Sequence, residues 1–268
     1  MNYLTNIELK NELKQMLIAL MKILEKYDIK YSIWAGTLLG AVRHGGFIPW
    51  DDDIDIAVER NEYVRLLNII KDDCNLKESF TGFELGSGDC PFIKYINPKI
   101  AISAEGLVDN RLWIDIFPLD YVPDNYAKYF KKQRSLSSEF WRNRAAKNEN
   151  VYNNMLKNKT PLKKIYNKFF IWLCGLKNEN VIIEKMINHS TKYLHKDCPY
   201  LCCVINGVFE GEVFPKQYFE EFGFIDFEGI RVPTLLKGKE WLTIRYGNYM
   251  QLPPVEQRVS HEVKAWIL

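Results

Sequence analysis

Three aspartates stand at alternate positions in the segment DDDIDIAV, at Asp51, Asp53 and Asp55. Side chains repeat every two residues along a strand, so Asp53 and Asp55 would share one face while Ile54 and Ile56 point into the core. Carboxylates that close repel each other unless a cation lies between them. Proteins hold Mg²⁺ with one or two carboxylates plus substrate phosphates. The spacing predicts a metal–phosphate site, with a solvated acidic loop as the alternative.

The segment before these aspartates offers a place for the phosphate. Residues 31–34 have the pattern of a short strand, residues 35–37 that of a tight turn, and residues 38–43 that of the start of a helix. A helix N-terminus presents free N–H groups and a positive dipole end to an anion. Gly36 would let the backbone approach the ligand closely, and Thr37 would add a hydroxyl.

Three further side chains lie next to this turn in the sequence. Arg43 and His44 come at the end of the expected helix, and Trp50 directly precedes the aspartates. Arg43 and His44 could bind the substrate or have a simple surface role, whereas Trp50 could screen the site from water or contact a sugar.

A fourth carboxylate stands inside an apolar strand pattern at residues 112–119. Asp115 lies between Ile114 and Ile116, and a buried carboxylate is unfavourable unless it is paired or bound to metal. With Asp53 and Asp55 it completes the three carboxylates that two-metal phosphoryl transfer uses. Asp120 follows the pattern and is expected in a turn.

A basic residue is expected on another strand. Residues 92–96 alternate as a strand does, so Lys94 would point away from Ile93 and could face the carboxylates. The alternative is that Lys94 is solvated.

These blocks carry a resemblance to a known family. The segment RHGGFIPWDDDIDIAV resembles the LicD family of phosphocholine transferases, which includes the fukutin-related enzymes and belongs to the polymerase-β-type nucleotidyltransferases. The likeness extends to WIDIFPLD at residues 113–120, to residues 246–254 and to His261. A glycosyltransferase with a DxD motif fits less well, because its aspartates normally end an apolar strand. Residues 121–200 contain no motif that we recognise.

The resemblance implies a fold, a reaction and a set of residues. The fold would be an α/β (α+β) nucleotidyltransferase-like core with a mixed sheet and flanking helices. The reaction would move phosphocholine from CDP-choline to a hydroxyl of a teichoic acid or lipopolysaccharide precursor and release CMP. Two Mg²⁺ or Mn²⁺ ions would be held by Asp53, Asp55 and Asp115, which are also the expected catalytic residues. The substrate would be bound by Gly36, Thr37, Arg43, His44, Trp50, Lys94 and His261.

Length and composition indicate one globular domain. The chain has 268 residues, of which 47% are hydrophobic and 26% charged, as in ordinary soluble proteins. We expect a core of about 1–120 and 200–268. No apolar run approaches the ~20 residues that span a bilayer, and the N-terminus lacks a signal-peptide layout. A cytoplasmic protein is expected, peripheral at the inner face of the plasma membrane, with its six cysteines reduced.

Residues 121–199 are expected to form a helical, basic insertion. Between residues 126 and 177 there are thirteen Lys and Arg against two Glu. Lys163, Lys164 and Lys168 adjoin the apolar run from Phe169 to Leu173, and basic residues beside apolar ones favour an anionic membrane surface over nucleic acid. The alternative is a solvated insertion whose aromatic residues are core.

Other patterns concern structure first. A capping box at Thr5 and Glu8 opens a helix, residues 61–71 predict a second helix, and residues 224–232 predict a strand or a hairpin. A helix at 237–246 would end at Gly247. Two weaker readings stay open: zinc binding by His189, His195, Cys198, Cys202 and Cys203, and a cation–π choline pocket from Trp241, Tyr246, Tyr249 and Trp266.

Two functional alternatives also stay open. One is transfer of another CDP-linked or NTP-derived group on the same fold. The other is a non-catalytic, membrane-associated binding module.

Overall fold

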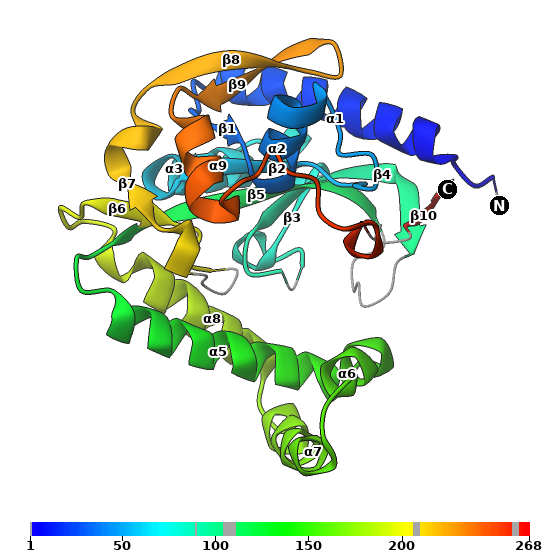
Figure 1. The fold of residues 1–268 in the computed structure, drawn as a ribbon, viewed down its shortest axis with the longest axis vertical. Coiled ribbons are helices and arrows are strands. Elements are labelled where there is room, and N and C mark those ends of the chain that lie inside the picture. Colours follow the sequence, from blue (N-terminus) through cyan, green and yellow to red (C-terminus); the bar gives the residue numbers. More distant parts are fainter. Residues whose placement is uncertain (1, 89, 104–110, 206–209, 259–262) are drawn as a thin grey trace.

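The centre of the protein is a mixed β-sheet. The computed structural model describes residues 2–88, 90–103, 111–205, 210–258 and 263–268. Within them the strand order is β1-β2-β5-β4-β10, with β3 beside β4, and with β6 and β7 continuing from β5 (Figure 1). β2 and β5 run parallel, and the other neighbours are antiparallel. The expected mixed-sheet α/β fold is confirmed. The strands are β1 Ser32–Ile33, β2 Asp55–Glu59, β3 Phe80–Thr81, β4 Ile93–Ser103, β5 Arg111–Val122, β6 Tyr200–Cys202, β7 Phe214–Pro215 and β10 Lys264–Ile267.

Helices and a separate hairpin cover the sheet. The helix α1 packs on β5, α3 on β2 and β5, and α2 on β2, the hairpin and α9. The Thr5 hydroxyl accepts the Glu8 N–H and the Glu8 carboxylate accepts the Thr5 N–H, which confirms the capping box. The elements are α1 Asn6–Lys26, α2 Ala35–His44, α3 Arg60–Asp72, α4 Cys74–Lys77, the hairpin strands β8 Phe222–Phe227 and β9 Ile230–Leu235, and α9 Gly238–Tyr246.

A group of four helices connects β5 to β6 and lies on one side of the sheet (Figure 1). These are α5 Ala127–Ala145, α6 Glu149–Leu156, α7 Pro161–Gly175 and α8 Glu179–Ser190. α6, α7 and α8 all pack against α5, and α7 lies farthest from the sheet. None of the helices in the described part of the chain is long and apolar enough to cross a bilayer.

A buried ion pair joins this helical group to the core. Asp120 is not in a turn, as the sequence suggested, but inside β5, where Arg60 Nε donates to its Oδ1 at 2.6 Å. Both side chains are 1% exposed. Arg60 also donates to Ser190 Oγ of α8 at 3.4 Å, so one guanidinium links α3, β5 and α8. The two partners are sixty residues apart, which is why the local pattern gave no sign of the pair.

Breaking this pair should destabilise the protein strongly. Asp120→Asn keeps the shape of the side chain but leaves a buried guanidinium without its countercharge, and such losses cost about 3–5 kcal/mol. The free energy of unfolding should fall by that amount in urea titration. Arg60→Met combined with Asp120→Leu should recover most of it, because the double change removes both charges.

The matched control is the exposed pair on the same helix. Arg65 and Glu62 lie 2.7 Å apart with side chains 44% and 27% exposed, so Glu62→Gln should cost less than about 1 kcal/mol. If Asp120→Asn costs no more than Glu62→Gln, the buried pair does not hold the insertion to the core.

Candidate active site

Asp55, Asp115 and Lys94 lie side by side on one face of the sheet. Asp55 of β2 is the register partner of Asp115 in the parallel strand β5, and Asp115 is the partner of Lys94 in β4. Residues directly opposite on neighbouring strands project to the same face. Lys94 Nζ is 3.5 Å from Asp115 Oδ1 and 3.5 Å from the centroid of the Trp113 ring. The sheet therefore brings together two carboxylates and one ammonium group from three separate segments.

The opposite face of these strands is the core. The isoleucines that alternate with the charged residues are fully buried: Ile54, Ile56, Ile93, Ile114 and Ile116. Because side chains alternate along a strand, burying these isoleucines fixes the charged residues on the other face.

Asp51 and Asp53 complete an acidic cluster. The strand β2 begins only at Asp55, so both residues lie in the segment that leads into it. Burial raises the pKa of Asp55 well above its usual value, and the charges of Asp53, Asp115 and Asp51 raise it further, while Lys94 opposes them. The four carboxylates thus act on one another electrostatically.

The helix α2 holds the acidic segment in place. The expected tight turn at 35–37 is wrong, because α2 already begins at Ala35. A Cβ on Gly40 would lie 2.4 Å from the Gly46 carbonyl oxygen, and one on Gly36 would lie 2.7 Å from Asp51 Oδ2. Only glycine lets the returning loop lie this close to the helix. The loop therefore runs back along α2 and delivers the aspartates to β2.

Thr37 has a positioning contact that the sequence did not indicate. Its side chain is 4% exposed, and its hydroxyl oxygen accepts the backbone N–H of Asp55 at 2.8 Å. The hydroxyl thus fixes the first residue of β2 directly.

Two arginines flank Trp50 next to this segment. The guanidinium carbons of Arg43 and Arg258 lie 6.0 and 5.3 Å from the centroid of the Trp50 ring, within cation–π range. Arg43 donates to His44 Nε2 at 2.9 Å and to the Tyr249 carbonyl at 3.0 Å. Burial, and then the charge of Arg258, lower the pKa of Arg43. Neither arginine forms an ion pair with an acidic side chain that the structure describes, so the pair offers positive charge to an anion.

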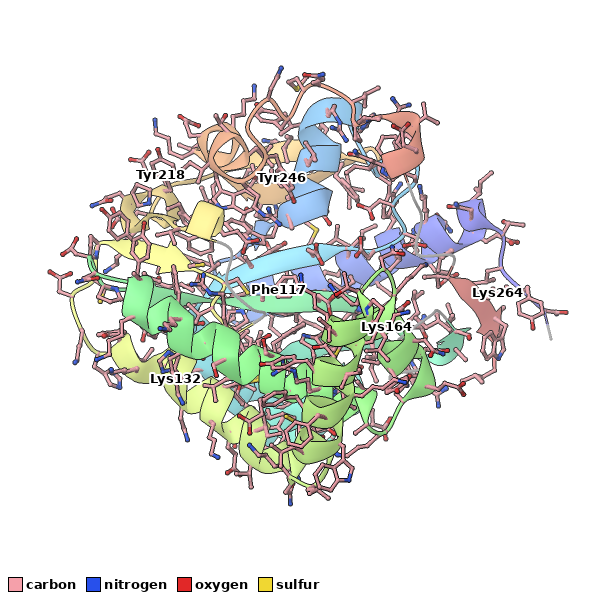
Figure 2. The ribbon with its side chains drawn as sticks, turned by 60° about the horizontal axis from the view of Figure 1, so that its bottom comes forward. Phe117, Lys132, Lys164, Tyr218, Tyr246 and Lys264 are labelled. Carbon is pink, nitrogen blue, oxygen red and sulfur yellow. The ribbon has the colours of Figure 1, made fainter. Side chains whose placement is uncertain are left out.

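Tyr246 lies within electrostatic range of Arg43 and of the carboxylates. Burial raises the pKa of its hydroxyl to about 12, and the charges of Asp55 and Asp51 are among the further causes. The same tyrosine acts on the guanidinium of Arg43. In Figure 2 it lies on α9, on the opposite side of β5 from Lys164.

The donor set suits a hard divalent cation. Asp115 Oδ1 is buried and accepts no hydrogen bond from the described residues, and the cluster supplies only carboxylate oxygens, which Mg²⁺ and Mn²⁺ prefer. Among those same residues no three His, Cys, Asp or Glu side chains are gathered as a finished metal site. The carboxylates fit such an ion by chemistry and charge, and its binding stays a prediction.

Other predicted groupings lie elsewhere or are not formed. His261 falls outside the described residues. Trp241 is 1% exposed and its ring centroid is 3.8 Å from that of Trp34. Trp266 lies in β10 and packs on Tyr3 near the N-terminus. The four aromatic residues therefore form no single choline pocket.

The cysteines considered for zinc are buried thiols. Cys198, Cys202 and Cys203 are at most 6% exposed. Burial raises the pKa of Cys202 well above its usual value, which favours the neutral thiol over the thiolate that zinc requires. His189 Nε2 is engaged with the Tyr129 carbonyl at 2.9 Å.

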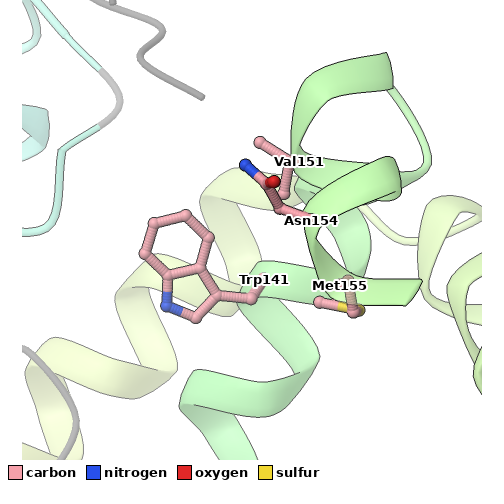
Figure 3. Close-up of a pocket in the computed structure, with 4 residues that line it drawn as sticks. All are labelled: Trp141, Val151, Asn154 and Met155. Atoms are coloured by element: carbon pink, nitrogen blue, oxygen red, sulfur yellow. The ribbon is translucent and has the colours of Figure 1, made fainter. Parts of the chain in front are cut away.

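A hollow in the helical group contains none of the predicted site residues. It has a volume of about 270 Å³ and is lined by Trp141 of α5 and by Val151, Asn154 and Met155 of α6 (Figure 3).

Three residues that lie in or beside the site were not assigned to it from the sequence. Asp51 was visible in the alternating pattern but was not assigned a role. Tyr246 was considered only as an aromatic wall. Arg258 lies more than two hundred residues from Arg43, and only the fold shows that both contact Trp50.

Comparison with known proteins places the chain in a family. Residues 28–148 match the family model described as LicD/FKTN/FKRP, nucleotidyltransferase domain. The lipopolysaccharide cholinephosphotransferase LicD of Haemophilus influenzae is 31% identical over 257 residues, which cover 91% of each chain. The ribitol 5-phosphate transferase FKRP of Homo sapiens is 47% identical over 36 residues, only 13% of this chain and 7% of that protein. The match along nearly the whole length, together with the acidic cluster on one face of the sheet, shows that this chain belongs to the LicD family.

Proposed function

We propose that this protein transfers phosphocholine from CDP-choline to a hydroxyl group of a cell-surface glycan precursor and releases CMP. The name of its Haemophilus relative, a lipopolysaccharide cholinephosphotransferase, supports the transferred group. The observation that carries the proposal is the row of Asp55, Asp115 and Lys94 on one face of the sheet. Such a row can bind a diphosphate through cations and stabilise charge that develops during phosphoryl transfer.

The acceptor belongs to the lipopolysaccharide or teichoic acid type in this proposal. A precursor of that type that is carried on a lipid would be met at the inner face of the plasma membrane, by an enzyme that stays in the cytoplasm.

Asp53, Asp55 and Asp115 would hold one or two Mg²⁺ or Mn²⁺ ions. When bound there, such an ion would supply Lewis-acid stabilisation of the charge on the donor's diphosphate. The acceptor hydroxyl oxygen bonds to the phosphorus that carries choline, and the bond from that phosphorus to the CMP oxygen breaks, so CMP leaves with the electron pair. The hydroxyl proton passes to Asp115, whose Oδ1 is buried and accepts no hydrogen bond from the described residues. Lys94 supplies a positive charge beside it.

The reaction is tested by measuring CMP release. Asp53→Asn and Asp55→Asn each remove one negative charge and hardly change the volume, so the fold should persist. Each should lower the rate more than tenfold, since 1.36 kcal/mol of lost transition-state stabilisation is one factor of ten. The matched control is Asp72→Asn at the exposed end of α3, which should leave the rate unchanged.

The donor decides between the proposal and its alternatives. CDP-choline, CDP-ribitol and CTP would be offered separately with Mg²⁺. Turnover of CDP-ribitol or CTP in preference to CDP-choline would mean that the enzyme transfers a group other than phosphocholine. Binding of CDP-choline in calorimetry without any CMP release would instead indicate a binding module.

The charge of Asp55 should oppose folding when no cation is present. Its folded-state pKa is raised, so the free energy of unfolding falls as pH rises from the unfolded pKa through the folded one. In EDTA at neutral pH, Asp55→Asn should therefore melt at a higher temperature than the wild type, and the difference should vanish in acid. Mg²⁺ should raise the melting temperature of the wild type but not of the variant. A variant that melts lower in EDTA would show instead that the Asp55 carboxylate has a structural hydrogen-bonding role.

Arg43 and Arg258 should bind a phosphate of the donor. Arg43→Gln or Arg258→Gln removes a charge-assisted hydrogen bond, which contributes about 1.5–3 kcal/mol, so the calorimetric Kd for CDP-choline should rise at least tenfold. The control is Arg231→Gln, because Arg231 lies 5.0 Å from the ring centroid of Phe224 in the exposed hairpin. Equal Kd values for all three variants would mean that the arginines around Trp50 only support the structure.

A further inference from the structure

The helix α7 and its C-cap residue Leu176 expose a continuous stripe of large apolar side chains. Leu162 is 81% exposed, Ile165 67%, Phe169 55%, Trp172 60% and Leu176 68%. Scattered apolar residues are normal on protein surfaces, but a contiguous patch marks an interaction site. These five side chains, together with Tyr166, are called the α7 stripe below.

The stripe is distinct from the face with which α7 packs on the protein. Its members follow the spacing of one helix face and cover an arc of about 120° at 3.6 residues per turn. Ile171 and Cys174 point to the other side and are buried, and Phe170 is partly buried with the Arg142 guanidinium 5.2 Å from its ring centroid. The helix thus has one apolar face that packs against the protein and a second apolar face that is exposed and available to a binding partner.

The helix is held so that the second face stays outward. The Asn143 side-chain amide of α5 donates to the Cys174 carbonyl at 2.7 Å and to the Lys177 carbonyl at 2.8 Å. Two hydrogen bonds from a fully buried asparagine fix the C-terminal end of α7. Figure 1 shows α7 at the end of the molecule farthest from the sheet.

The surroundings of the stripe are basic throughout. Residues 150–178 contain six lysines and no aspartate or glutamate. At about 100° per residue, Lys168 and Lys163 flank the two edges of the stripe on the helix surface, next to Trp172 and Tyr166, and both are exposed. The one ion pair that the described part of this segment makes to another segment joins Lys177 to Glu139 at 2.7 Å.

We infer that the α7 stripe docks the protein on an anionic lipid bilayer, with α7 lying flat in the headgroup region. An interfacial helix combines an apolar face that includes Trp and Tyr with flanking lysines, and α7 has both. This inference narrows the expected membrane contact from residues 126–177 to a single helix. It also excludes Phe170 from that contact, because Phe170 packs toward Arg142 of α5. Vesicle binding does not depend on the proposed transfer reaction.

Two other occupants fit the surface less well. A symmetric contact between two copies would use the same patch on both. It would bring together lysines of the two copies in a segment without acidic residues, and these positive charges would repel each other. Nucleic acid would satisfy the lysines but would leave six large apolar side chains in water.

The test uses the full chain with vesicles of phosphatidylcholine, with or without phosphatidylglycerol, over a salt series. Co-sedimentation should require phosphatidylglycerol and weaken as salt rises. Phe169→Ser with Trp172→Ser should lower binding more than tenfold at every salt concentration, because apolar insertion is not screened. Lys163→Gln with Lys168→Gln should lower it about fivefold per lysine at low salt and flatten the salt dependence.

Matched controls carry the same kinds of change on α1 and in the segment that follows it, away from the stripe. Ile7→Ser alters an apolar side chain that is 83% exposed, and Lys22→Gln with Lys30→Gln removes two exposed lysines. Neither should change vesicle binding. All variants should keep the wild-type melting temperature, since the altered side chains are exposed.

Three results would overturn the inference. One is a wild type that ignores anionic vesicles at low salt. Another is vesicle binding that survives the stripe changes undiminished. The third is a dimer, seen by sedimentation equilibrium without vesicles, that the Phe169→Ser and Trp172→Ser changes dissolve, because the stripe would then be a contact between copies.

Discussion

Repulsion between carboxylates on one face of a sheet is the constraint on which this protein depends. Asp55 and Asp115 are register partners on parallel strands, only about 5 Å apart between strand axes, and Asp51 and Asp53 add to the field at Asp55. Such a cluster does not form by side-chain attraction. It exists because the isoleucines on the other face are buried, and because Lys94 is placed beside Asp115. The free energy of the core thus holds together groups that oppose one another, and a cation would relieve that opposition.

The remaining elements set where each charge lies. Glycines on α2 let the acidic segment approach, and the Thr37 hydroxyl fixes the backbone of Asp55. At the other end of β5, Asp120 is paired with Arg60 and reaches α8 through it. One strand therefore carries a carboxylate of the acidic cluster near its start and an ion-paired one near its end. The two differ in their partners: Asp120 has a guanidinium within hydrogen-bonding distance, whereas Asp115 has an ammonium group 3.5 Å away.

How much of this could be predicted from the sequence depended on the range of the interactions. The alternation of charged and apolar residues was enough to predict that Asp55, Asp115 and Lys94 each lie opposite the isoleucines of their own strand, because strand geometry is local. It could not show that the three side chains are neighbours, because that depends on the register between strands from remote segments. The start of α2 was misplaced, since the Ala-Gly-Thr segment has the composition of a turn and its helical state is decided by packing against the loop. Asp120 was misread for a similar reason: its partner Arg60 is remote in sequence. The contact of Arg258 with Trp50 likewise exists only in the folded chain.

Charges of opposite sign lie in different parts of the molecule. An anionic bilayer would repel four clustered carboxylates at short range, and salt screens that repulsion beyond about 8–10 Å. α7 lies at the end of the molecule farthest from the sheet, so its lysines can meet lipid headgroups while the carboxylates stay clear of the surface. The net charge of +2 hides this separation. The proposed function and the inferred docking would require both charges, one for a cation-bound diphosphate and the other for an anionic surface, and would require them apart.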